Sequence, residues 1–294
     1  MKHLNSIIAL AAVGLSAVAC MKEDKPQNLV PVTVRVNDFS ITQEEISTTP
    51  ASTKTTETPE SYTGIKAFTL AFFDAAGVEA FNETQIRSDS DSYETFGNFN
   101  LSLPMGSYTM VVLGYGGEDP VTFNGMTEVS FGEAIPRETF AYTSNVTINN
   151  TDLMEIEATL QRIVARLAVR STDITPPELH SVRVSVSKGG ESFNPITGLA
   201  TSDTGVSVLF YRYTSVGSTT RTLINFFLTS DEENMDVTVE TMDENENVLL
   251  SKTITNVPFK RNRNTILSGK MFSDSASLGF LLSTDFLPDL DLQF

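Results

Sequence analysis

The first clear pattern in the chain is an alternation of apolar and polar side chains over residues 30–41. Valine occupies every second position from 30 to 36, and polar side chains such as Arg35 lie between the valines. A period of two residues predicts a β-strand with one buried face. Residues 42–63 are mainly Thr, Ser, Glu and Pro. They bury little apolar surface, so we expect a flexible connection between the first strand and the rest of the chain.

Strand-like runs bounded by Gly, Pro and Asn turns recur along the rest of the sequence. A strand pair is predicted to turn at residues 74–77, and a hairpin is predicted about residues 104–106. Residues 153–170 alternate like a strand in their first half and then keep helical spacing, so a long strand is predicted and a helix is the alternative. Further strands are predicted at 127–131, 139–148, 181–187, 206–213, 221–229, 236–242 and 248–255, near 257–272, and at the C-terminus. The pattern indicates an all-β protein built of two β-sandwich domains that join near residue 165.

The N-terminus has the layout of a signal peptide. An apolar run over residues 7–19 follows Lys2 and ends with small residues directly before Cys20. The run is shorter than the roughly 20 apolar residues that a membrane-spanning helix needs. Residues 17–20, Ala-Val-Ala-Cys, resemble a bacterial lipobox, which predicts that Cys20 is acylated and becomes the first mature residue. The alternative is an ordinary secreted protein that keeps a free thiol.

Composition narrows the range of functions. Cys20 is the only cysteine, so disulfides cannot stabilise the fold. The formal net charge is −17, and the loss of Lys2 with the signal would make the mature chain more negative by one. Such a surface repels phosphate backbones, so nucleic acid is not an expected partner. His180 is the only histidine outside the signal, and no phosphate-loop, dinucleotide-binding or zinc-protease motif occurs. We therefore expect no enzymatic activity, no metal and no cofactor.

Four stretches resemble the fimbrillin family, the type V pilin subunits of anaerobe surface fimbriae. They are the lipobox at Cys20, residues 65–77 (IKAFTLAFFDAAG), residues 160–169 (LQRIVARLAV) and residues 257–272 (VPFKRNRNTILSGKMF). The resemblance implies two transthyretin-like, Greek-key β-sandwich domains in tandem. The divisions expected on this basis are 1–19 (signal), 20–64 (acylated N-terminus, removable first strand 29–41 and linker), 65–165 (first sandwich, which includes that strand) and 166–294 (second sandwich with the donor strand).

The resemblance also implies a mechanism of assembly. Precursors of this family travel as lipoproteins, a trypsin-like protease cuts after a basic residue in the linker, and the first strand leaves. The groove then accepts a strand from another subunit, commonly its C-terminal segment. The candidate donor here is residues 278–294, although Pro288 interrupts the strand pattern. Its apolar positions are Leu278, Phe280, Leu282, Phe286, Leu290, Leu292 and Phe294.

One position departs from the family pattern. The residue that is cut is usually Arg, but Lys54 is the only basic residue between Ile41 and Ile65. Either a lysine-tolerant protease cuts at Lys54, or the chain is never cut and keeps its lipid as the anchor of a fibre. The expected location is the surface of the outer membrane or the fimbria. The expected partners are other fimbrial subunits and a surface receptor.

Several polar groups allow a functional interpretation beside a structural one. His180 could act as a base or lie unused at the surface. The run at residues 88–94, SDSDSYE, could bind calcium but lacks the glycine and distal glutamate of an EF-hand. Arg261 and Arg263 form the only dense basic patch and could bind an acidic partner or simply form a turn. Tyrosines could line a glycan-binding surface or pack within strands. They are Tyr93, Tyr108, Tyr115, Tyr211 and Tyr213.

Overall fold

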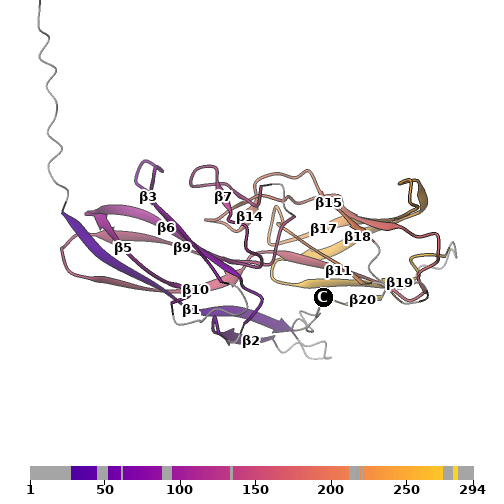
Figure 1. Cartoon of the computed structure of the whole chain (residues 1–294), viewed down its shortest axis with the longest axis horizontal. Coiled ribbons are helices and arrows are strands. Elements are labelled where there is room, and N and C mark those ends of the chain that lie inside the picture. Colours follow the sequence, from indigo (N-terminus) through magenta and orange to yellow (C-terminus); the bar gives the residue numbers. More distant parts are fainter. Residues whose placement is uncertain are drawn as a thin grey trace, which may run out of the picture.

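The chain folds into β-strands (Figure 1). The computed structural model describes residues 28–44, 52–60, 62–87, 95–132, 135–211, 217, 219, 221–273 and 281–283, and no helix occurs among them. The prediction of an all-β protein is confirmed. Residues 153–170 form two strands, β10 (Met154–Arg162) and β11 (Ala165–Ser171), so the helical alternative is wrong. The division into two transthyretin-like domains with Greek-key topology stays a prediction.

The first sheet has eight strands in the order β2-β1-β10-β9-β6-β3-β4, with β5 also paired to β1. Its members besides β10 are β1 (Leu29–Glu44), β2 (Ser52–Glu57), β3 (Ala67–Asp74), β4 (Glu79–Ile86), β5 (Asn98–Pro104), β6 (Gly106–Tyr115) and β9 (Thr139–Ile148). β10 and β9 pair only through Gln161 and Arg162. The sheet therefore bends there, and its two parts enclose one apolar core to which β1, β3, β5, β6, β9 and β10 all contribute.

The β3–β4 hairpin forms where the sequence predicts it. The Asp74 carboxylate accepts hydrogen bonds from the backbone N–H groups of Ala76 and Val78, and Gly77 supplies the positive φ of 77° that the turn requires. The hairpin predicted about residues 104–106 is wrong. β5 pairs with β1, whereas β6 pairs with β3 and β9, so the chain crosses from one layer to the other at this corner. Local turn residues cannot distinguish a crossing from a hairpin.

Two four-stranded sheets form the second half of the molecule. One has the order β16-β11-β19-β20 and the other β15-β12-β17-β18. Their strands besides β11 are β12 (Ser181–Val186), β15 (Val206–Tyr211), β16 (Arg221–Phe226), β17 (Glu232–Met242), β18 (Val248–Lys260), β19 (Asn264–Gly269) and β20 (Leu281–Ser283). Alternating apolar residues of both sheets meet in a second core. The chain passes from the first sheet into this half at Ile163 and Val164.

A small sheet and a third apolar cluster connect the two halves. The small sheet has the order β14-β13-β8-β7 and contains β7 (Thr122–Phe123), β8 (Val129–Ser130), β13 (Phe193–Asn194) and β14 (Leu199–Ala200). Val129 pairs with Phe193 across the two halves. The cluster covers the outer face of β3 and β6 with side chains such as Phe227 from the second half. β3 is therefore buried on both faces from Ala67 to Phe73.

The segment expected to be a flexible linker contains a strand. β2 pairs antiparallel with residues 39–44 of β1, and β1 itself extends to Glu44 instead of ending at Ile41. Pro59 is buried, and Tyr62 packs against the core of the first half. The expectation is wrong for residues 52–57, because a Thr-rich segment with little apolar surface can still form a ladder of backbone hydrogen bonds on an existing strand.

Candidate functional site

Strand β1 is enclosed by other strands on both edges. Residues 32–40 pair in parallel with β10, and residues 29–35 pair antiparallel with β5. β2 pairs with β1 and with no other strand in the part of the chain that the structure describes. Removing β1 would therefore leave unpaired backbone donors and acceptors along both β10 and β5, which must be satisfied by another strand or by water.

The inward face of β1 supplies five side chains to the first core. They are Val30, Val32, Val34, Val36 and Phe39, each at most 6% exposed. Full burial of one such side chain contributes about 1.5–3 kcal/mol. The pairing with β10 shifts between Val36 and Asp38, so Asn37 is an extra residue in a β-bulge. The fifth inward side chain therefore follows the fourth after three residues instead of two.

Phe39 fills a pocket that is lined by aromatic rings. Its ring stacks on Phe68 of β3 with centroids 5.8 Å apart, and it meets Phe140 of β9 edge-on at 5.0 Å. Tyr62, from the segment after β2, lies at 6.1 Å. Aromatic pairs of this kind stabilise by about 0.5–1.5 kcal/mol beyond their buried area. We call the pocket bounded by Phe68, Phe140 and Tyr62 the aromatic slot.

Gly114 of β6 fixes the position of one wall of the aromatic slot. A Cβ atom at residue 114 would lie 2.8 Å from Cε1 of Phe68 and 3.2 Å from Cδ2 of Leu160. Because both neighbours are packed in the core, we expect Gly114→Ala to lower the free energy of unfolding by about 1–3 kcal/mol in urea titrations. Gly106→Ala is the matched control, since its Cβ would meet only Tyr108 at 3.4 Å. Equal losses in the two variants would contradict this role of Gly114.

Beside the slot, Glu138 is buried between two arginines of consecutive strands. Its Oε1 lies 2.5 Å from Nη2 of Arg162 in β10, and its Oε2 lies 3.2 Å from Nη2 of Arg166 in β11. Arg162 also donates a 3.0 Å hydrogen bond to the hydroxyl of Tyr62 and lies over the ring of Phe140 at 4.8 Å. Glu138, Arg162 and Arg166, which we call the junction cluster, thus link the first sheet to the second half and to the aromatic slot.

The sequence indicates the arginines of the junction cluster but not their acidic partner. Arg162 and Arg166 interrupt the apolar stretch at 160–169, and a buried guanidinium needs an anionic partner. That reasoning indicates that a carboxylate is nearby, but the chain has 37 Asp and Glu residues. Glu138 directly precedes β9, which pairs with β10 at Arg162, and it contacts both arginines only in the folded chain.

The charges of the two arginines control the ionisation of Glu138. Burial alone would raise the pKa of this carboxyl, but the positive charges of Arg162 and Arg166 oppose it, together with hydrogen bonds involving Tyr62 and Arg166. The net result is a pKa below the usual value for glutamate. Glu138 is therefore an anion in the folded protein at neutral pH.

The lowered pKa of Glu138 predicts a pH-dependent contribution to stability. A depressed pKa stabilises the fold above the unfolded-state pKa of about 4.5, and this contribution is lost as the pH falls through the lower folded-state value. We expect the difference in free energy of unfolding between wild type and Glu138→Gln to be large at pH 7 and smaller at pH 3. Urea titrations at the two pH values measure it. A difference that does not change with pH would contradict the assignment.

Of the residues predicted for export and cleavage, the structure places one. Cys20 lies outside the described residues. Lys54 lies in β2, where it is the backbone partner of Thr42 in β1. Proteases bind their substrates as single extended chains, so cleavage at Lys54 requires β2 to separate locally from β1. The backbone at Arg35 pairs with β10 on one edge and with β5 on the other, so cleavage there would require β1 to separate from both strands.

Three residues of the predicted donor strand are described, and they form β20 (Leu281–Ser283). Leu282 belongs to β20, where it is the backbone partner of Leu267 in β19 of the same chain. This pairing involves three residue pairs at the edge of a sheet. The other predicted donor residues lie outside the described residues. They are Leu278, Phe280, Phe286, Leu290, Leu292 and Phe294.

The basic patch forms a turn. Arg261 and Asn262 connect β18 to β19, and Asn262 has a positive φ of 59°. Arg261 pairs with Asp231 at 2.7 Å and donates to the carbonyl of Thr197 at 2.7 Å. Arg263 is buried. Both arginines therefore contact their own chain, as expected for a structural turn.

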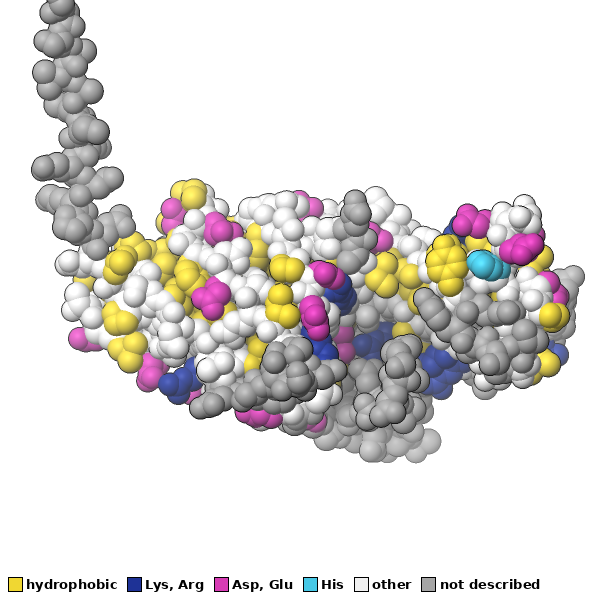
Figure 2. All heavy atoms as spheres, viewed as in Figure 1, with side chains coloured by type: hydrophobic (Ala, Val, Ile, Leu, Met, Phe, Trp, Pro, Cys, Tyr) yellow, Lys and Arg dark blue, Asp and Glu magenta, His cyan; other side chains and the backbone are white. Residues whose placement is uncertain are grey.

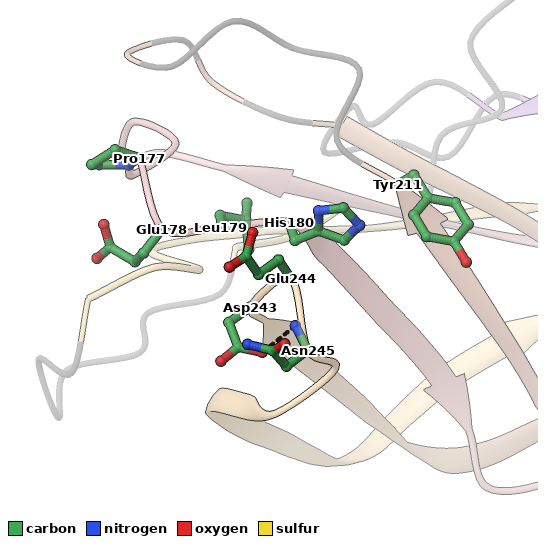
Figure 3. Close-up of a pocket in the computed structure, with 8 residues that line it drawn as sticks. All are labelled: Pro177, Glu178, Leu179, His180, Tyr211, Asp243, Glu244 and Asn245. Carbon is green, nitrogen blue, oxygen red and sulfur yellow. Dashed lines mark hydrogen bonds between the residues drawn. The ribbon is translucent and has the colours of Figure 1, made fainter.

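His180 lies beside an open hollow of about 490 Å³ at the end of the second half (Figure 3). Its ring meets the half-exposed ring of Tyr211 edge-on at 5.8 Å. Glu178 and Glu244 also line the hollow. Asp243 does so too, but its carboxylate is engaged in the turn, since hydrogen bonds from Asn247 lower its pKa. On the molecular surface, a histidine side chain (cyan) lies between apolar (yellow) and acidic (magenta) side chains (Figure 2).

The remaining candidates give no further site. Tyr108 and Tyr115 are buried in strands, and Tyr93 and Tyr213 lie outside the described residues, as does the acidic run at 88–94. Within the described ranges, no group of three or more His, Cys, Asp or Glu side chains is arranged to hold a metal ion. No helix that could cross a membrane is found in the same ranges.

Comparison with known proteins gives a family. No curated protein matches the chain. The model of a family of unknown function, DUF6562, matches residues 83–292, well over half of the chain. The chain belongs to the DUF6562 family. The DUF6562 match begins within β4, so it includes the junction cluster and β20 but neither β1 nor β2.

Solved structures with a similar arrangement come from several bacteria. A candidate adhesin from Bacteroides ovatus is 11% identical over 85% of this DUF6562 chain and 88% of its own, with a TM-score of 0.51. The fimbrial anchor protein Mfa2 from Porphyromonas gingivalis is 15% identical over 82% and 90% of the two chains, with a TM-score of 0.45. A fimbrial assembly protein from Parabacteroides distasonis is 11% identical over 87% and 99%, with a TM-score of 0.41. The first of these indicates a shared fold.

Proposed function

We propose that this DUF6562 protein is a structural subunit of a fimbria at the cell surface that supports adhesion and is assembled by β-strand exchange as in the fimbrillins. In this proposal, Cys20 is acylated during export to the outer membrane, and cleavage at Lys54 frees β1. A strand of another fimbrial subunit then replaces β1. The strand that this chain donates in turn to a further subunit is its C-terminal segment from Leu278 to Phe294. The protein has no catalytic role and needs no cofactor.

The enclosure of β1 supports the proposal. β1 pairs on both edges and places five side chains in the first core. Along the chain, β2 is the only described strand between β1 and β3. A cut at Lys54 therefore separates β1 from the chain without removing any strand from β3 onward. The groove left between β5 and β10 has the hydrogen-bonding groups and apolar pockets that β-strand addition uses.

Peptide uptake after cleavage tests the proposal. The full chain is cut at Lys54 by a lysine-specific protease under native conditions and then mixed with a fluorescent peptide of residues 29–44. We expect the cut protein to exchange its own β1 for the peptide. Lys54→Ala, which retains β1 covalently, should take up none. Equal uptake by both proteins, or none by a protein cut at Lys54, would contradict removal of β1.

A second candidate function is glycan binding without polymerisation. The hollow at the end of the second half favours it, because an exposed aromatic ring beside carboxylates is a common arrangement for sugar recognition. Tyr211, Glu178 and Glu244 would make the contacts. Raised thermal stability in the presence of a glycan, lost in Tyr211→Ala, would support this function. In a third alternative, the chain is never cut and anchors a fimbria through its lipid.

A further inference from the structure

The shape of the groove indicates which strands it can accept. The fifth inward position is the aromatic slot, whereas the first four positions hold valine side chains. These pockets differ in size and in the chemistry of their walls. A strand that replaces β1 must present side chains that fit these five positions in the same order. The side chain at the fifth position distinguishes such a strand most clearly from an ordinary apolar strand.

The walls of the aromatic slot are held in place from outside the groove. Phe68 is confined by Gly114 on one side and by Gly97 on the other, where added Cβ atoms would lie 2.8 Å and 3.3 Å from the ring. Arg162 lies over Phe140 and bonds to Tyr62, and Glu138 holds Arg162. The rings therefore cannot close over the space that Phe39 occupies without breaking these contacts.

The slot also has a fixed position along the groove. Phe39 is the backbone partner of Leu160, and Val36 is the partner of Ala158. A strand that pairs regularly with β10 would reach the slot two residues after its fourth inward side chain. β1 takes three residues because Asn37 is bulged. The pairing register with β10 therefore fixes where the fifth inward side chain of an incoming strand must lie relative to the fourth.

We propose that the aromatic slot determines partner specificity: the groove selects strands of another protein chain that carry four aliphatic side chains at alternate positions and then an aromatic ring at the fifth inward position. This inference rests on the proposed function. A phenylalanine regains the stacked and edge-on contacts with Phe68 and Phe140. A leucine loses these ring contacts and leaves part of the slot empty.

Competition between peptides tests the slot. The protein cut at Lys54 is given the fluorescent peptide of residues 29–44 together with an unlabelled competitor. The competitors are the wild-type peptide, Phe39→Leu, Phe39→Ala and the outward-facing control Arg35→Ala. We expect the Leu and Ala peptides to compete at least about tenfold and about a hundredfold more weakly than wild type, and Arg35→Ala to stay within about threefold. Equal competition by the wild-type and Phe39→Leu peptides would contradict the proposal that the aromatic slot determines partner specificity.

A measurement on the uncut chain separates failure of the slot from failure of strand removal. If no peptide binds to the cut protein, not even the wild-type peptide, then removal of β1 is contradicted. The preference of the aromatic slot for a phenylalanine is then tested by stability measurements alone. In the uncut chain, Phe39→Leu should then raise the equilibrium constant for unfolding at least about tenfold, and Arg35→Ala less than about threefold. Similar unfolding equilibrium constants for the two variants would then contradict the preference of the aromatic slot for a phenylalanine.

Discussion

Replacing Glu138 with alanine should lower the free energy of unfolding by about 3–5 kcal/mol, the loss expected when one partner is removed from a buried ion pair. The variant leaves Arg162 and Arg166 buried without their shared carboxylate. Two like charges would then face each other at the point where β10 continues into β11. Urea titration at pH 7 measures the effect.

A surface ion pair provides the control for Glu138. Asp119 pairs with Arg137, but its side chain is 78% exposed. Water already solvates that carboxylate, so Asp119→Ala should change the free energy of unfolding by no more than about 1 kcal/mol. A Glu138→Ala loss that is no larger than the Asp119→Ala loss would show that the junction cluster does not stabilise the connection between the halves.

Replacing Phe39 with alanine should cost about 3–5 kcal/mol of unfolding free energy, because it removes a fully buried ring and leaves a cavity. The cavity would lie between Phe68 and Phe140, whose positions are fixed by neighbouring contacts. The core therefore cannot collapse easily around the missing ring. Thermal or urea unfolding of the uncut chain measures the change.

Arg35→Ala is the matched control on the same strand. Arg35 faces outward, and its side chain is 55% exposed beside Glu155 at 3.6 Å. Its replacement should change stability by less than about 1 kcal/mol. If Phe39→Ala and Arg35→Ala had similar small effects, β1 would not be seated in the first core as the structure has it.

Local patterns predicted much of the strand content. The alternation of valines identified β1, and Asp74 with Gly77 identified the β3–β4 turn, because both signals depend on neighbouring residues alone. β2 was missed because a polar segment gains its strand pairing from β1 and not from burial of its own side chains. The corner at residues 104–106 was misread because pairing partners lie far away in sequence.

The candidate site was only partly visible in the sequence. The sequence indicated the first strand and Lys54 as parts of the site. The two arginines of the junction cluster lie within the family-like stretch at residues 160–169. The aromatic slot combines Tyr62, Phe68 and Phe140 from three separate segments, so no local spacing indicates it. The same holds for Glu138, which is distant in sequence from both arginines and contacts them only in the folded chain.

The most direct test is the intact mass and N-terminal sequence of the mature protein taken from the cell surface. The proposed function predicts a chain that begins at Thr55 and carries no lipid, because β1 has been removed with residues 20–54. A chain that retains residues 20–54 with an acylated Cys20 would contradict removal of β1. That result would instead assign the protein as a tethered anchor or a stand-alone adhesin.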